Sequence, residues 1–300
     1  MDNGQGFVQR NYFLLRRLHS LTGVIPIGAF MLIHLTTNSS ILWGALNGRA
    51  HAETAIGRGV ETFQDEVSFI NGMPLLLLIE ILVLWLPIAF HAVFGVAFAL
   101  TASNNVAQYG YWGNKRYILQ RLSGYLGFAF ILYHVATLRW GWEWLTPAGT
   151  AWSHYFATST LAAALKGDGG QWTVPGIIVS IGYFIGVSAL VFHFANGLLT
   201  ASITWGIAVS QEARQRWGYM CTALGAVVML LAWSALAGFV FLVDHDEALQ
   251  IERRMVELKY GREFLEEIEQ EHLNRPEMEA SAIRRAAEAP YPGPAPVIHE

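Results

Sequence analysis

The sequence has little cysteine and little charge. Its one cysteine, Cys221, excludes an intrachain disulfide framework, and a four-thiolate iron–sulfur cluster within this chain is excluded because such clusters need several Cys ligands. No Cys-x-x-Cys-His motif occurs, so a haem attached in the c-type manner is not expected. Charged residues make up 14% of the chain and hydrophobic ones 53%, whereas soluble domains carry about 25% charge. The net charge of −4 argues against a nucleic-acid partner.

Apolar residues are gathered in five runs, each long enough to cross a bilayer, which takes about 20 residues. The runs are Leu18–Thr37, Met73–Leu100, Ile118–Leu138, Val174–Thr200 and Tyr219–Val243. Prolines and glycines within such runs are tolerated in membrane helices. The sequence therefore predicts an all-α membrane protein, with an N-terminal segment at 1–17, a five-helix membrane domain at 18–243 and a tail at 244–300.

The tail has a different composition from the rest of the chain. Of the 23 Asp and Glu residues, 14 follow Val243. Up to about Asn274, apolar residues recur at near-helical spacing, which predicts an amphipathic helix. Residues 290–296 are rich in proline, which predicts an extended or disordered segment. At the other end, Met1–Arg17 lacks the pattern of a signal peptide.

Lysine and arginine in the short flanks of the spans predict the orientation, because they favour the cytoplasmic side. One side carries Arg10, Arg16, Arg17, Lys115, Arg116, Arg121, Arg214 and Arg216. The loops on the other side are longer and mix basic with acidic residues. We therefore expect a multi-pass protein of the cytoplasmic membrane with a cytoplasmic N-terminus and an external tail.

Of the ten histidines, four lie well inside the predicted spans, one in each of the first four: His34, His91, His134 and His193, whereas His19 lies at the very start of the first span. At 1.5 Å of rise per residue, His34 and His134 lie about 25 Å and 20 Å from the cytoplasmic edge. His91 and His193 lie on helices of the opposite direction, about 25 Å and 27 Å from the outer edge. Depth therefore pairs His34 with His134 on the outer side and His91 with His193 on the inner side.

A pair of facing imidazoles on neighbouring helices is the geometry of a bis-histidine haem site, and a helix bundle provides it. We expect helices one to four to surround two stacked b-type haems. Small residues one turn after the inner histidines, Gly95 and Gly197, would leave room for a flat macrocycle. A membrane histidine can also serve as a hydrogen-bonding residue between helices, and a set of them can relay protons in a transporter. These readings remain open.

Several motifs around these histidines follow one another in a known order. They are Arg16-Arg17-Leu-His19-Ser20-Leu-Thr-Gly23 with His34, Phe90-His91-Ala-Val-Phe-Gly95, Leu119-Gln-Arg121-Leu-Ser-Gly124 with His134, Phe192-His193-Phe-Ala-Asn196-Gly197, and Thr204-Trp205-Gly206. Over about residues 9–240, this pattern closely resembles the cytochrome b558 subunit of succinate dehydrogenase and fumarate reductase, a single-chain, five-helix, dihaem membrane anchor. The tail after Val243 and the long loop Trp140–Thr173 depart from it.

The resemblance implies that the four histidines are the axial ligands of two haems b, paired as depth pairs them. It also implies a flavoprotein subunit with FAD and an iron–sulfur subunit on the cytoplasmic face, as in respiratory complex II. Electrons would pass through the two haems to a quinone, commonly menaquinone. Succinate chemistry would belong to the partners, so this chain alone should lack catalytic residues and succinate dehydrogenase activity.

Other polar residues have two readings each. Arg17, His19, Ser20 and Arg121 are candidates to contact haem propionates or the iron–sulfur subunit, because guanidinium suits carboxylate, or they simply mark the cytoplasmic side. Glu80 is a candidate for the quinone or proton site, or else a protonated, hydrogen-bonded acid.

The function has alternatives as well. The chain fits the dihaem b anchor of another quinone-linked enzyme, such as a hydrogenase or formate dehydrogenase. In a different class, it fits a haem-free proton-coupled transporter.

Overall fold

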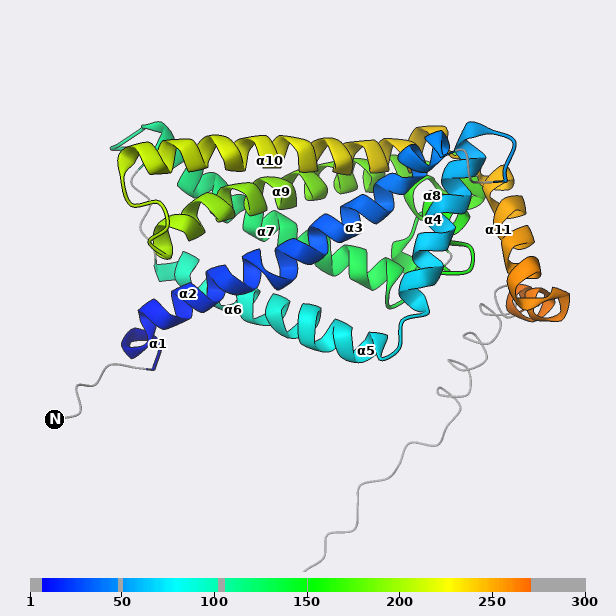
Figure 1. The fold of residues 1–300 in the computed structure, drawn as a ribbon, viewed down its shortest axis with the longest axis horizontal. Coiled ribbons are helices and arrows are strands. Elements are labelled where there is room, and N and C mark those ends of the chain that lie inside the picture. The colour runs from blue at the N-terminus through cyan, green and yellow to red at the C-terminus, as the bar shows by residue number, and fades with distance from the viewer. Residues whose placement is uncertain (1–6, 48–50, 102–105, 150, 271–300) are drawn as a thin grey trace, which may run out of the picture. The chain divides into compact units, whose positions relative to one another are not determined.

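The computed structural model describes residues 7–47, 51–101, 106–149 and 151–270, and every regular element in these residues is a helix (Figure 1). The chain divides into a unit of residues 1–252 and a smaller unit of residues 253–300. In the described residues, four helices are long and apolar enough to cross a membrane: Tyr12–Leu46, Leu76–Thr101, Val174–Thr204 and Gln211–Leu242. The protein is therefore an all-helical integral membrane protein.

The first of these helices is longer than predicted at both ends. After the short α1 (Phe7–Arg10), it comprises α2 (Tyr12–Val24), α3 (Pro26–Trp43) and the 3-10 turn η1 (Gly44–Leu46). Pro26 stands at the start of α3, where its missing N–H costs no helical hydrogen bond. The polar residues Ser39 and Ser40 extend the helix past the predicted end because they are buried in protein, where α3 packs against α4 (Ala55–Asn71).

The second helix is interrupted by a wide turn. It runs as α5 (Leu76–Ile79), the π-helical segment η2 (Glu80–Trp85) and α6 (Leu86–Thr101). Pro87 follows the π segment and cannot donate to the backbone ladder, and π segments of this kind are frequent at functional sites. Glu80 is the first residue of the wide turn.

The third predicted run forms α7 (Trp112–Leu138), which has 27 residues and a length of about 40 Å at 1.5 Å per residue. It is not among the four helices that are apolar enough to span a membrane; even its last 18 residues include Arg121, Ser123 and His134. A fifth span therefore remains a prediction.

α9 (Val174–Thr204) is central to this unit, because it packs against α7, α2, α8 (Ala157–Lys166) and α10 (Gln211–Ala237). α10 continues into a second π segment, η5 (Gly238–Leu242). Most large apolar side chains along these helices are exposed, as expected of surfaces that lie in lipid.

The two long loops contain helices that the sequence analysis did not predict: α4, the 3-10 turn η3 (Glu143–Leu145), α8 (Ala157–Lys166) and the 3-10 turn η4 (Asp168–Gly170). In α4, Thr54 caps the first turn by accepting from the N–H of Gly57 at 2.9 Å. Val60, Phe63 and Val67 follow at helical spacing. These three side chains form the main buried cluster together with Ile41, Ala157, Leu161, Ala162, Leu165, Tyr183, Phe239, Val240, Val243 and Ala248.

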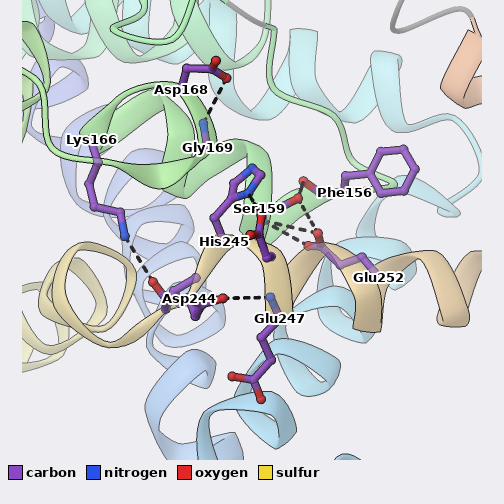
Figure 2. Close-up of polar contacts among 11 residues, drawn as sticks. Phe156, Ser159, Lys166, Asp168, Gly169, Asp244, His245, Glu247 and Glu252 are labelled. Atoms are coloured by element: carbon purple, nitrogen blue, oxygen red, sulfur yellow. Dashed lines mark hydrogen bonds and ion pairs between the residues drawn. The ribbon is translucent and has the colours of Figure 1, made fainter.

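α8 is held at both ends by charged side chains (Figure 2). The buried carboxylate of Glu252 accepts from the backbone N–H of Thr158 at 2.5 Å and from the hydroxyl of Ser159 at 2.5 Å. Burial raises the pKa of Glu252 to about 7. At the other end, Lys166 Nζ donates to the carbonyl of Val243 at 3.1 Å, and burial lowers the pKa of this ammonium group.

α11 (His245–Tyr260) is the helix expected after Val243. Within the second unit, Arg253 Nε pairs with Glu269 Oε1 at 2.6 Å. The proline-rich segment at 290–296 lies outside the described residues, as does the start of the N-terminal segment, residues 1–6.

Candidate metal-ligating histidine pairs

α6 and α9 bring the rings of His91 and His193 together. Their centroids are 6.0 Å apart, and the two ring planes are nearly perpendicular, at 85°. Nδ1 of His91 lies 2.9 Å from the carbonyl oxygen of His19 in α2. Nδ1 of His193 lies 2.9 Å from the carbonyl oxygen of Gln120 in α7. A carbonyl oxygen only accepts, so each Nδ1 carries the proton and each Nε2 keeps its lone pair, as in ligands that are oriented by a backbone acceptor.

Glycines of the neighbouring helices make room for these two rings. A Cβ added at Gly23 would come within 2.4 Å of His91 Cε1, and one at Gly124 within 2.9 Å of His193 Cε1. Both separations are shorter than ordinary van der Waals contact, which is about 3.5–4.0 Å between carbon atoms. Each imidazole therefore lies directly against the backbone of another helix.

α3 and α7 form a second pair from His34 and His134. The ring centroids are 5.7 Å apart at an interplanar angle of 82°. The hydroxyl of Tyr183 lies 3.4 Å from His134 Nδ1, and the amide nitrogen of Asn38 lies 3.4 Å from His34 Nε2. The 15 residues from His19 to His34 correspond to a rise of about 22 Å. The two pairs therefore lie at clearly different heights.

Both spacings fit a metal held between two imidazoles. A metal–nitrogen bond of about 2.0 Å places the metal roughly 3 Å from each ring centre, and thus the two centres roughly 6 Å apart. In the part of the chain that is described, no group of three or more His, Cys, Asp or Glu side chains is placed to hold a metal ion. Two imidazoles leave most of a metal's coordination positions open, so a planar macrocycle that brings its own donors suits each pair.

His19 lies beside the His91–His193 pair. Its ring stacks on that of His91, with centroids 4.0 Å apart and an angle of 13°. It also lies against Gly95, where an added Cβ would meet His19 Cε1 at 3.1 Å. The space that the sequence analysis assigned to a macrocycle at Gly95 is thus lined by a histidine. Among the described residues, His19 Nδ1 is a buried atom without a hydrogen-bond partner, and so is suited to a group such as a carboxylate.

Of the other basic and hydroxyl candidates, Arg17 and Ser20 lie on α2 and Arg121 lies on α7. Ser20 Oγ donates to the carbonyl of Arg17 at 2.9 Å and accepts from Trp205 Nε1 at 2.8 Å. Arg17 has an exposed side chain. Arg121 donates to the carbonyl of Ala99 and lies over the ring of Tyr117, 4.8 Å from its centroid.

Glu80 forms a bidentate ion pair with Arg139. Arg139 Nη2 lies 2.9 Å from Glu80 Oε2 and Arg139 Nε lies 3.2 Å from Oε1. The Glu80 side chain is 17% exposed and that of Arg139 is 52% exposed. Arg139 is thus the partner of Glu80. Close by in sequence, Trp85 stacks on Trp140 with centroids 5.7 Å apart.

Sequence reasoning missed a polar chain that ends at His193. Arg116 donates to Asn196 Oδ1 from two nitrogens, at 3.0 and 2.5 Å, and Asn196 Nδ2 donates to Gln120 Oε1 at 2.7 Å. Gln120 Nε2 lies 3.2 Å from His193 Nδ1. The signal was present in the spacing, because Asn196 lies three residues after His193 and Gln120 four after Arg116, and such residues share a helix face.

No protein-family model matches this chain, and no solved structure matches it. The curated succinate dehydrogenase cytochrome b558 subunit of Bacillus subtilis (strain 168) is 32% identical over 233 residues, which cover 76% of this chain and 97% of the relative. A match that spans nearly the whole relative at this identity shows that the chain belongs to the family of succinate dehydrogenase cytochrome b558 subunits.

Proposed function

We propose that this protein is the dihaem membrane anchor of a succinate:quinone oxidoreductase, which carries electrons from an iron–sulfur subunit to a quinone. The observation that carries the proposal is the presence of two perpendicular imidazole pairs, with centroids 5.7 and 6.0 Å apart, at two heights of one bundle. Hydrogen bonding between membrane helices would not by itself require two pairs of facing imidazoles with similar spacing and angle. The name of the Bacillus subtilis relative, a cytochrome b558 subunit, supports haem b as the bound group.

In this proposal, His91 and His193 would hold one haem b, and His34 and His134 would hold the other. A bound haem supplies one-electron redox chemistry. The protein sets the ring orientation of each ligand through its Nδ1 partner and sets the potential through burial and neighbouring charge. His19, with its buried and unpartnered Nδ1, is placed to contact a propionate at the His91–His193 site.

The distribution of basic residues supports a cytoplasmic N-terminus, with α7 as a fifth span. Arg16 and Arg17 at the start of α2, and Lys115 and Arg116 at the start of α7, then lie on the cytoplasmic side. The His91–His193 pair is nearer to this side, because its backbone acceptors, His19 and Gln120, stand near the start of α2 and α7. The flavoprotein and iron–sulfur subunits would bind here.

The Glu80–Arg139 ion pair supports a quinone site at the opposite side, near His34 and His134. Reduction of a quinone takes up protons as well as electrons, and Glu80 is a half-buried carboxylate that can pass a proton from water. Arg139 holds this carboxylate in place by two hydrogen bonds. Menaquinone is the quinone that we propose.

A dithionite-reduced minus oxidised spectrum of the purified protein tests the proposal. We expect two b-type haems per chain that titrate at different potentials. Replacement of His91 or His193 by Ala should remove one haem, and replacement of His34 or His134 the other. A protein without b-type absorption would be a haem-free protein such as a proton-coupled transporter. Loss of the same haem from the His34 and His91 variants would contradict the pairing.

Copurification tests the partners. A membrane-extracted complex should contain a flavoprotein with FAD and an iron–sulfur subunit, and the isolated chain should not oxidise succinate. A nickel or molybdenum subunit in their place would assign the chain to a hydrogenase or formate dehydrogenase.

A further inference from the structure

A chain of side-chain hydrogen bonds connects a permanent positive charge to one ligand candidate. It begins at the guanidinium of Arg116 and passes through the amides of Asn196 and Gln120 to the backbone of His193. The hydrogen bonds measure 2.5 Å from Arg116 to Asn196, 2.7 Å from Asn196 to Gln120 and 3.1 Å from Gln120 Nε2 to the backbone carbonyl of His193. The last bond fixes the amide against this turn of α9, with Nε2 lying 3.2 Å from the ring atom Nδ1 of His193, whose own proton is donated to the Gln120 carbonyl.

The two amides in this chain are oriented in the same direction. Asn196 accepts from Arg116 through its oxygen and donates to Gln120 through its nitrogen, and Gln120 accepts through its oxygen and presents its nitrogen to His193. Each amide dipole thus has its positive end toward the histidine. Hydrogen bonds in series polarise one another. The positive potential of Arg116 is therefore conveyed toward His193 and is not lost to solvent.

Burial keeps this effect from being screened. Asn196 is 5% exposed, and Arg116 and Gln120 are half-buried between α7 and α9. Charges in such positions are screened by salt much less than exposed ones. A guanidinium also stays protonated at every relevant pH, so its charge is constant.

The polar groups that face the rings of the second pair are neutral. His134 Nδ1 faces the Tyr183 hydroxyl at 3.4 Å, and His34 Nε2 faces the Asn38 amide at 3.4 Å. The two pairs resemble each other in ring spacing and angle. The hydrogen-bonded chain at His193 ends in a single positive charge, whereas the Glu80–Arg139 ion pair near the second pair carries one charge of each sign. A nearby positive charge stabilises the state of a redox centre that holds one more electron.

We propose that Arg116, acting through Asn196 and Gln120, raises the reduction potential of the haem ligated by His193 and leaves that of the haem at His34 and His134 nearly unchanged. This inference rests on the proposed function, since it concerns the same haem site. Arg116, Asn196 and Gln120 are positioning residues that act on the haem through its ligand.

The experiment is a redox titration of the purified complex, followed by visible absorption, with Arg116→Gln against the unaltered protein. At a fixed ambient potential, we expect the ratio of reduced to oxidised haem at His91–His193 to fall by roughly tenfold, equivalent to about 59 mV for one electron. A charge at roughly 10–15 Å in a medium of effective dielectric about 20 has an effect of this size. Arg116→Lys keeps the positive charge, so its ratio of reduced to oxidised haem should lie close to that of the unaltered protein.

The matched control is Lys115→Gln. It removes a positive charge from the same turn of α7, but the side chain is exposed, so its effect should be screened and small. A second variant, Asn196→Asp, keeps Arg116 and neutralises its charge at the same place. It should lower the same ratio as Arg116→Gln does.

Three results would overturn the proposal. The first is a shift in Arg116→Gln no larger than in Lys115→Gln, and the second is an equal shift of both haems. The third is loss of the haem from Arg116→Gln with an unshifted potential in Asn196→Asp, which would assign the chain a structural role only. Absence of any haem from the unaltered protein would instead refute the proposed function, so the two failures are distinguishable.

Discussion

The contact between Gly23 and His91 allows a test of the His91–His193 site that leaves both histidines in place. In Gly23→Ala, the new Cβ would lie 2.4 Å from His91 Cε1, where carbon atoms need about 3.5 Å. The ring must then move by roughly 1 Å, whereas metal–ligand distances tolerate about 0.2 Å. We expect the haem at this pair to be lost or weakly bound and the other haem to be kept.

The free-energy cost of Gly23→Ala comes from packing against His91 and not from the helical propensity of α2. Alanine is favoured over glycine within a helix by about 0.8–1.0 kcal/mol, so α2 itself should gain stability. Overpacking at a closed contact costs about 1–3 kcal/mol, and that cost falls on the His91 ring. Gly124→Ala, where the new Cβ would lie 2.9 Å from His193 Cε1, should affect the same haem.

The assay is haem content by pyridine haemochrome together with a resolved redox titration. Gly182→Ala is the matched control, because it adds the same methyl group to α9, which carries His193, at a position with no atom within 4 Å of the new Cβ. Gly23→Ala should lose the component that His91→Ala loses, and Gly182→Ala should lose neither. If Gly23→Ala kept both haems with unchanged potentials, the close packing of His91 on α2 would be refuted.

Three further predictions concern other parts of the molecule. Glu80→Gln should slow quinone turnover at least tenfold and keep both haems, as measured by quinone reduction and by spectra, and unchanged turnover would leave Glu80 a structural role. Burial raises the pKa of Glu252 from 4.5 to about 7, so the folded state binds this proton more tightly than the unfolded chain, and stability should fall by up to roughly 3 kcal/mol as pH rises from about 4.5 to 7. Thermal unfolding between pH 5 and 8 checks this, and a profile in Glu252→Gln as steep as that of the unaltered protein would contradict it. In the cap of α9, Thr173 Oγ1 accepts from Gly176 N at 3.1 Å, and Thr173→Ala should lower the free energy of unfolding by about 1 kcal/mol. The measurement is the unfolding temperature, which should be lower than that of Thr222→Ala, a control change at an exposed position in α10.

The sequence was a good guide to the membrane helices because their apolar runs follow from bilayer thickness alone. Four of the five runs coincide with helices apolar enough to span. The ends were less well predicted, since hydropathy marks where lipid ends and not where the helix ends. Ser39 and Ser40 continue α3 because α4 covers them, and a polar residue gives no sign of such cover.

The candidate pairs were predictable because depth follows from counting residues along a rigid helix. The partners of the rings were not, since they depend on how the helices rotate about their axes. A backbone carbonyl, such as that of Gln120, leaves no mark in the sequence. The ion pair between Glu80 and Arg139 joins residues 59 positions apart, and no periodicity connects them.

Both rings of the His91–His193 pair are oriented by main-chain oxygens, those of His19 and Gln120. An acceptor of this kind is present whatever side chain its residue carries, so no single codon change can delete it. A genetic screen for loss of this site should therefore return the two histidines and the glycines that lie against them, but not His19 or Gln120 on account of their carbonyl oxygens. Only a substitution that bends α2 or α7, such as an introduced proline, would displace these oxygens and reveal their contribution.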